Sequence, residues 1–210
     1  MTRLHVVLEF GAASPLHTAA DRVELWADRV ALRDWRGKVT FAATSIKGWL
    51  RDSAERALRG MGCLACEGCA ASTACGECLV CRVFGHPRGK SPLRFTDVFL
   101  AEPLTGVRTQ ASLSRRRRTA YEERLFSTEV AWSRTLRAEI DGIFEDEVSA
   151  GEAAALLWVA AKSGFALGAA RSRGLGWVRL DRISVTRDGR EMTESELADA
   201  VSKWRRANSG

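Results

Sequence analysis

Six cysteines are the residues of this sequence most clearly suited to chemistry, and all of them lie within one short segment. They are spaced C-x2-C-x2-C-x5-C-x2-C-x2-C, at Cys63, Cys66, Cys69, Cys75, Cys78 and Cys81. Thiolates two residues apart can turn towards one metal ion, and two such pairs complete a tetrahedral four-sulfur site. Residues 63–81 contain few large apolar side chains, so a bound ion would replace a core there. The spacing therefore predicts a closed, structural Zn²⁺ site and not a catalytic one.

Two other uses of the cysteines remain open. Four thiolates also suit an iron–sulfur cluster, and cysteines in an oxidising compartment form disulfides. The sequence has no apolar run of about 18 residues, and its start, "MTRLHVVLEF", is typical of a strand and not of a signal peptide. We therefore expect a cytosolic protein without a membrane partner. Clustered cysteines in the cytosol more often bind a metal than form disulfides.

Arginines form the second chemical feature. The net charge is +6, and Arg115, Arg116, Arg117 and Arg118 are consecutive, with Arg108 before them and Arg124 after them. A solvated surface cluster is one interpretation of such a run. Adjacent guanidinium groups repel one another, however, and arginine pairs well with phosphate. The run therefore predicts a polyanionic partner such as a nucleic acid.

A glycine-rich segment, "LGAARSRGLGWVRL", is the third feature. It contains Gly168, Arg171, Arg173, Gly174 and Gly176. Glycine accepts positive φ and lets a backbone approach a phosphate closely, although a plain helix-to-strand turn is the alternative. Lys47 lies in "TSIKG", at the expected positive end of a helix, which is a second place to bind an anion.

The periodicity of apolar residues predicts the elements that carry these groups. Strands are expected at 3–10, 93–100, 134–143 and 176–186, and helices at 45–59, 149–164 and 193–206. Ser149 with Glu152, and Thr193 with Glu196, match the capping-box pattern at the starts of the last two helices. Apart from the C-terminal helix, this order is βαββαβ. It predicts one α+β domain over 1–210 with a ferredoxin-like core, which RNA-recognition domains share.

Several motifs together resemble the RAMP superfamily of CRISPR proteins, above all the backbone subunit that repeats along type III effector complexes. "VVLEFGAASPLHT" resembles the family's first strand and the turn after it, and "AATSIKGWLR" resembles the start of its first helix. "CLVCRVFG" resembles the "CpvCrlFG" of zinc-bearing members, and "LGAARSRGLGWV" resembles the superfamily's glycine-rich loop. "LSRRRRTAYEERLFSTEV" resembles the stretch that forms the family's thumb hairpin, which implies such a hairpin at 105–132.

The resemblance implies an RNA-binding protein with further copies of itself and other CRISPR effector subunits as partners. Guide RNA and complementary target RNA would be its ligands, and the subunit would cleave target RNA at regular intervals as an endoribonuclease. "ADRVALRD" resembles the family's cleavage loop, which places the catalytic aspartate at Asp28 and a second aspartate at Asp34. Mg²⁺ or Mn²⁺ would assist that reaction.

The resemblance also implies a set of site residues. Those expected to contact RNA are Lys47, Arg51, Arg115, Arg116, Arg117, Arg118, Thr119, Gly168, Arg171, Arg173 and Gly174. Those expected to bind zinc are Cys69, Cys75, Cys78 and Cys81, with Cys63 and Cys66 as alternates.

Two other functions remain as alternatives. The chain could be a RAMP subunit that only binds or caps guide RNA, or one that matures it, for which His17 is the candidate residue. It could also be an unrelated zinc-bearing nucleic-acid-binding protein.

Overall fold

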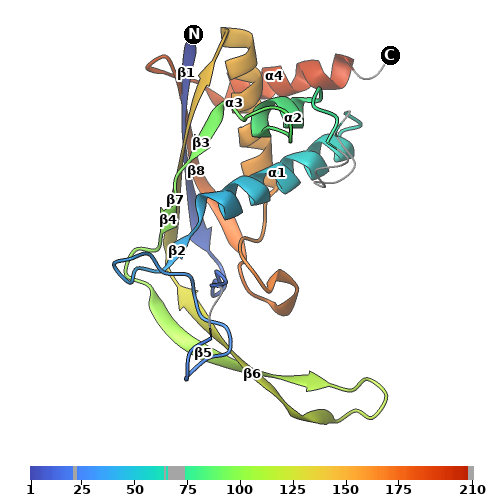
Figure 1. Cartoon of the computed structure of the whole chain (residues 1–210). Helices are drawn as coiled ribbons and strands as arrows, with labels where there is room; N and C mark the ends of the chain where they lie inside the picture. Colours follow the sequence, from blue (N-terminus) through green and yellow to red (C-terminus); the bar gives the residue numbers. More distant parts are fainter. Residues whose placement is uncertain (21–22, 64, 66–73, 208–210) are drawn as a thin grey trace.

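A five-stranded antiparallel sheet lies at the centre of the protein, and helices cover one of its faces (Figure 1). The computed structural model describes residues 1–20, 23–63, 65 and 74–207, with the backbone alone described at 123 and 205–207. The strands, in spatial order, are β3 (Leu93–Phe95), β7 (Thr135–Phe144), β1 (Thr2–Ala12), β8 (Val178–Arg187) and β9 (Arg190–Glu191). β1 pairs antiparallel with both β7 and β8. The predicted α+β class is therefore confirmed.

The helices form where apolar positions repeat. Those of the described chain are α1 (Ala43–Gly60), α2 (Leu79–Phe84), α3 (Glu147–Ser163), α4 (Glu194–Ala207) and the single turn η1 (Arg171–Arg173). Four apolar residues of α1, spaced every four positions from Ile46 to Leu58, are all buried. α3 packs against α1, α4 and the sheet, which explains why its alanines are buried on most sides. None of the described helices is long and apolar enough to cross a membrane.

The chain order β1–α1–β3–β7–α3–β8 contains additional elements. They are α2, β2 (Thr40–Phe41), β4 (Val98–Phe99) and the hairpin strands β5 (Leu104–Leu113) and β6 (Ala120–Trp132). The strand expected over 93–100 is divided, because β3 joins the central sheet whereas β4 pairs with β2. Between the two parts, the Asp97 carboxylate accepts a hydrogen bond of 2.7 Å from the Ala43 N–H at the start of α1.

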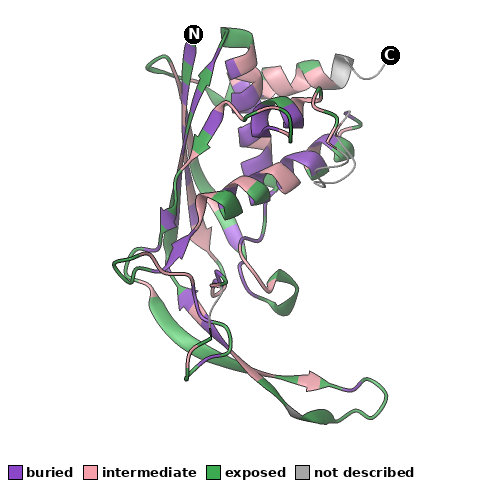
Figure 2. Ribbon diagram, viewed as in Figure 1, coloured by how far each residue is buried: buried purple, intermediate pink, exposed green. Residues whose placement is uncertain are grey.

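The core lies between the sheet and its helices, whereas the hairpin is mostly exposed (Figure 2). Alternate residues of β1, from Leu4 to Phe10, are buried and face this core. The Phe10 ring meets the Trp49 ring edge to face, with 5.2 Å between centroids. This contact joins the middle strand to α1.

The two expected capping boxes have different outcomes. At α4 the Thr193 N–H donates to the Glu196 carboxylate and the Glu196 N–H donates to the Thr193 hydroxyl, so that box is confirmed. At α3 the box is wrong, because the N-cap is Asp146, whose carboxylate accepts from the Ser149 N–H at 2.7 Å. Glu152 instead forms an ion pair with Arg82 of α2.

An irregular segment between β1 and β2 lies along one edge of β6, at the base of the hairpin. Leu16 and Ala131 exchange two main-chain hydrogen bonds there. Further along, the Arg29 N–H donates to the Ser127 carbonyl and the Glu129 N–H donates to the Arg29 carbonyl. These bonds place the segment that contains Asp28 beside the hairpin.

Candidate nucleic-acid interface and metal centre

Asp28 lies exposed at the base of the hairpin, where Ser127 holds it. The Ser127 N–H and hydroxyl donate to Oδ2 of Asp28 at 2.6 and 3.0 Å, and the Asp28 N–H donates to the Ser127 hydroxyl oxygen at 3.1 Å. The main-chain N–H of Ser127, and then its hydroxyl, hold the pKa of Asp28 below its ordinary value. Asp28 is therefore an ionised, oriented carboxylate at neutral pH, suited to binding a cation or accepting a hydrogen bond.

Asp34 has a structural position in the same segment. Its Oδ1 accepts hydrogen bonds from the main-chain N–H groups of Arg36 and Lys38 at 2.9 and 2.8 Å. This arrangement closes the turn before β2, as aspartate side chains commonly do. The structure therefore accounts for Asp34 without a role in chemistry.

His17 is buried, with 1% of its surface exposed. Its Nδ1 donates to the Glu129 carbonyl oxygen at 2.8 Å, because a carbonyl can only accept. Burial lowers the pKa of His17, so the ring is neutral at pH 7. A buried neutral imidazole is poorly placed to reach an RNA on the surface, which disfavours the guide-maturing alternative.

The first turns of α1 and the glycine–arginine loop (167–176) line one hollow of the surface. Ser45 and Gly48 contribute from the helix, and Gly168 and Arg171 contribute from the loop. No acidic residue lies in the first turn of α1, but the Asp97 carboxylate binds the start of the helix from outside. Asp52 of α1 also lines the hollow, 3.9 Å from Arg171. The structure thus brings together the helix start and the glycine–arginine loop, which are far apart in the sequence, in a hollow that contains both signs of charge.

The two glycines proposed to contact RNA differ in their surroundings. Both have positive φ, +92° at Gly168 and +80° at Gly174. A Cβ at Gly168 would lie 2.5 Å from the His17 carbonyl oxygen, so glycine is needed there for the loop to pack against its own chain. A Cβ at Gly174 would meet no atom within 4 Å, which leaves that position open to a ligand.

Lys47 and Arg51 lie on α1 but have different environments. Lys47 lines a second hollow together with Arg88 and Lys90, and burial, together with the neighbouring Arg51 charge, lowers its pKa. Arg51 is largely buried and donates to the Glu55 carboxylate at 3.0 Å and to the Gly85 carbonyl oxygen at 2.8 Å. Arg51 therefore joins α1 to the Phe-Gly end of the cysteine segment, and RNA binding by Arg51 stays a prediction.

The four consecutive arginines form the tip of the β5–β6 hairpin, far from the central sheet (Figure 1). The Ser114 N–H donates to the Thr119 carbonyl oxygen at 2.9 Å and closes the turn, with Arg118 in the left-handed region at φ 56°. All four arginine side chains are exposed, and so is Thr119. The tip is thus residues 115–118, between Ser114 and Thr119, and Ala120 already belongs to β6.

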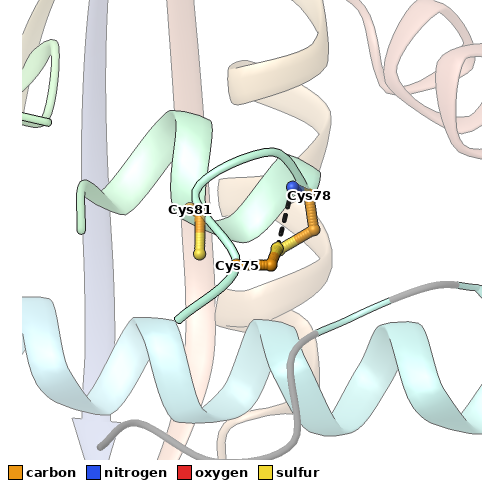
Figure 3. A group of neighbouring side chains, drawn as sticks. All are labelled: Cys75, Cys78 and Cys81. Atoms are coloured by element: carbon orange, nitrogen blue, oxygen red, sulfur yellow. Dashed lines mark hydrogen bonds between the residues drawn. The ribbon is translucent and has the colours of Figure 1, made fainter. Parts of the chain in front are cut away.

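Three cysteines at the start of α2 form a candidate metal centre. The sulfur atoms of Cys75, Cys78 and Cys81 all lie within 4.8 Å of one another (Figure 3). The Cys78 N–H donates to the Cys75 sulfur at 3.3 Å, and an Arg51 N–H approaches the Cys81 sulfur at 3.8 Å. Such N–H groups stabilise thiolate charge around a bound metal. Three convergent thiols fit a four-coordinate Zn²⁺ that takes one more ligand.

The expected fourth zinc ligand is one of the remaining cysteines. Cys63 is buried in the hydrophobic core after α1 and does not belong to the group of converging sulfur atoms. Cys66 and Cys69 lie outside the described residues. Within the described part of the chain, Cys63, Cys75, Cys78 and Cys81 form no disulfide with one another.

Comparisons with known proteins identify a family and a similar fold. Residues 10–179 match the family model of the RAMP superfamily. The chain belongs to the RAMP superfamily. No curated protein matches it. Its fold is similar to a chain in the "Cryo-EM structure of the Type III-B Cmr-beta bound to cognate target RNA", with a TM-score of 0.61 and 17% sequence identity. The match covers 88% of this chain and 61% of that chain.

Sequence patterns did not identify the residues that hold the site of this RAMP chain together. Glu129 of β6 is buried, and its carboxylate accepts hydrogen bonds from the Ala31 N–H at 2.7 Å and from Arg33. Ser127 and Glu129 have no distinctive motif, and their partners lie 96 to 99 residues earlier. The one available signal was a lone glutamate in an otherwise neutral run, "LFSTEVAW".

Replacing Glu129 by alanine should lower the free energy of unfolding by about 3–5 kcal/mol, because Arg33 and the Ala31 N–H would lose a buried partner. Urea denaturation measures this change. The matched control is Glu139→Ala, whose exposed pair with Arg137 should contribute less than about 1 kcal/mol. Equal losses in the two variants would contradict a structural role for the Glu129 pair.

Proposed function

We propose that this RAMP protein is the repeating backbone subunit of a type III CRISPR effector, which binds guide RNA and cleaves complementary target RNA. Its family and its likeness to a chain from a complex with target RNA support this proposal. Further copies of the chain would lie side by side along one guide RNA, together with other effector subunits.

One observation carries the proposal. An exposed, ionised carboxylate, Asp28, is held at the base of a hairpin whose tip carries four exposed arginines. The tip can bind the phosphates of a nucleic-acid strand, and the hollow beside α1 can bind those of another. A strand bound between the tip and the hollow would pass Asp28.

The bonds made and broken in the reaction are all in the RNA, and a positioned carboxylate assists them. The 2′-hydroxyl oxygen of the target attacks the adjacent phosphorus, and the bond from phosphorus to the 5′-oxygen breaks. The hydroxyl proton is lost to solvent through a hydrogen bond to Asp28, and the 5′-oxygen takes up a proton. The products are a 2′,3′-cyclic phosphate and a 5′-hydroxyl, so no further reactant is required.

Asp28 fits Mg²⁺ or Mn²⁺ as a single protein ligand. Mg²⁺ is commonly held by one or two carboxylates together with substrate phosphate oxygens and water. A bound ion would neutralise charge that develops on the phosphate. Asp28 itself keeps its orientation through Ser127 in either case.

The test is to purify the protein from its native operon and to sequence the RNA bound to it. Guide RNA of spacer-repeat length, and evenly spaced cuts in a complementary target, are the expected results. Bound guide RNA without target cleavage by the wild-type complex would favour a subunit that only binds. A protein without bound RNA and without partners would contradict the proposal and favour the unrelated zinc-bearing class.

Removing a positive charge from either of the two hollows beside α1 should weaken RNA binding, and the loss should depend on the salt concentration. In Lys47→Gln and Arg171→Gln the slope of log affinity against log salt should fall by about one unit each, without a change in sequence preference. Lys203→Gln is the matched control, because Lys203 is exposed on α4, away from both hollows. If Lys47→Gln and Arg171→Gln keep the wild-type affinity and slope, as the control should, the two hollows do not bind RNA.

A further inference from the structure

Phe126 of β6 lies against two guanidinium groups. The Cζ atom of Arg29 is 5.4 Å from the centre of the Phe126 ring, and that of Arg173 is 5.3 Å from it. The three residues come from the Asp28 segment, the hairpin and the glycine–arginine loop. Two like charges on one ring repel each other, so the arrangement is most favourable when an anion binds to both.

Both arginines have hydrogen-bond donors available. Arg29 and Arg173 are exposed, and within the described part of the chain neither guanidinium makes an ion pair or a hydrogen bond. Arg33 and Arg51, by contrast, are bound to buried glutamates. A guanidinium group offers five N–H donors in a planar fork that matches the oxygens of a phosphate.

The pair lies beside the candidate catalytic group. Arg29 follows Asp28 in the chain, and its N–H donates to the Ser127 carbonyl, whereas Phe126 directly precedes Ser127. The Arg29 charge also contributes, after larger causes, to the lowered pKa of both Asp28 and His17, so its guanidinium lies within electrostatic range of Asp28. A phosphate bound by the pair would therefore lie next to the Asp28 carboxylate.

We propose that Arg29 and Arg173 form a phosphate clamp on the Phe126 ring that holds the target-RNA backbone in position for cleavage at Asp28. The inference rests on the proposed function and deepens it. It assigns Arg173 to target RNA at the cut site, and not to guide RNA in the hollows beside α1. Phe126 is a positioning residue, because it acts through the two arginines.

Single-turnover cleavage by the reconstituted complex tests the clamp. Arg29→Gln and Arg173→Gln should each lower the rate about 10²-fold, because loss of alignment at a reacting phosphate has effects of this size. The amount of guide RNA in the complex should stay at the wild-type level. Unchanged rates, or loss of guide RNA from Arg173→Gln, would overturn the assignment.

Phe126 separates an aromatic role from a packing role. Phe126→Tyr keeps the ring and should cleave at nearly the wild-type rate, whereas Phe126→Leu keeps apolar bulk and should be slowed like the arginine variants. Both should keep the wild-type melting temperature. Equal rates in the two variants would contradict the clamp. Arg36→Gln is the matched control, because Arg36 stacks 4.4 Å from the Trp35 ring in the same segment and should cleave normally.

Asp28→Ala, measured in parallel, separates a failure of the clamp from a failure of the proposed function. An inactive Asp28→Ala with active Arg29 and Arg173 variants would overturn the clamp alone. A fully active Asp28→Ala would overturn the proposed function, and the clamp with it.

Discussion

Replacement of Asp28 by alanine is expected to lower the rate of target-RNA cleavage by about 10²–10⁴-fold, the usual effect of losing a group that moves or orients a proton. The complex should still assemble, because the Asp28 side chain is exposed and its contacts are limited to the Ser127 region. Cleavage of labelled target by the assembled complex measures the rate, and gel filtration measures the assembly.

Three controls show whether charge, position and the target's 2′-hydroxyl groups matter in this experiment. Asp28→Asn can still accept hydrogen bonds from Ser127 but has no charge, so it should be as inactive as the alanine variant. Asp141→Ala removes an exposed carboxylate on β7 that contacts His5, and it should cleave normally. A target without 2′-hydroxyls at the cut positions should bind and remain intact. Full activity of Asp28→Ala would overturn the assignment of Asp28 and the proposed cleavage function with it.

The contribution of Asp28 should not change through the neutral pH range. Hydrogen bonds from Ser127 lower its pKa below the ordinary 3.8, so the carboxylate is ionised at every pH above that value. Any stability from the Asp28–Ser127 contact is complete above that pH and is lost only as the pH falls through the lowered pKa. The ratio of wild-type to Asp28→Ala rates should therefore be equal at about pH 6 and about pH 8.

The second large effect is expected at the cysteines. The purified protein should contain about one zinc ion per chain, and Cys78→Ser should lose it and destabilise the cysteine segment that leads into α2. The reason is that apparent zinc affinities in small zinc sites reach about 10–16 kcal/mol, and residues 63–78 have few large apolar side chains to replace that energy. Elemental analysis and thermal unfolding measure the two changes.

The remaining cysteines provide the controls. Cys63→Ala should keep its zinc, because Cys63 belongs to the core and not to the converging sulfur atoms. Cys69→Ser should lose zinc if Cys69 is the fourth ligand, whereas loss in Cys66→Ser alone would assign that role to Cys66. Iron in place of zinc, with visible absorbance, would show a cluster instead. No metal at all would contradict the prediction.

Short-range patterns determined those features whose partners lie close together in the sequence. The four-residue spacing of Ile46, Leu50, Ala54 and Leu58 predicted the buried face of α1. The spacing of Cys75, Cys78 and Cys81 predicted three sulfur atoms that can share one ion. Such contacts form within one or two turns of the chain, so the residue types and their spacing are sufficient to predict them.

Competition between neighbouring residues limited even these short-range predictions. Ser149 and Glu152 match a capping box, but Asp146 is a better acceptor three residues earlier and becomes the N-cap. Arg51 was selected as an RNA-binding candidate, and the fold also binds it to Glu55 and to the Gly85 carbonyl oxygen, so its contact with RNA stays a prediction. A pattern shows which groups are available and does not show which partner is nearest.

Tertiary structure alone decided how the candidate site is assembled. Asp28 meets Ser127 across 99 residues of sequence, and the guanidinium groups of Arg29 and Arg173 both approach the Phe126 ring. These contacts depend on which edge of β6 the irregular segment covers and in which register, and main-chain hydrogen bonds from Leu16 and Arg29 set both. Main-chain groups are the same at every residue, so the side-chain pattern of the sequence does not specify that pairing.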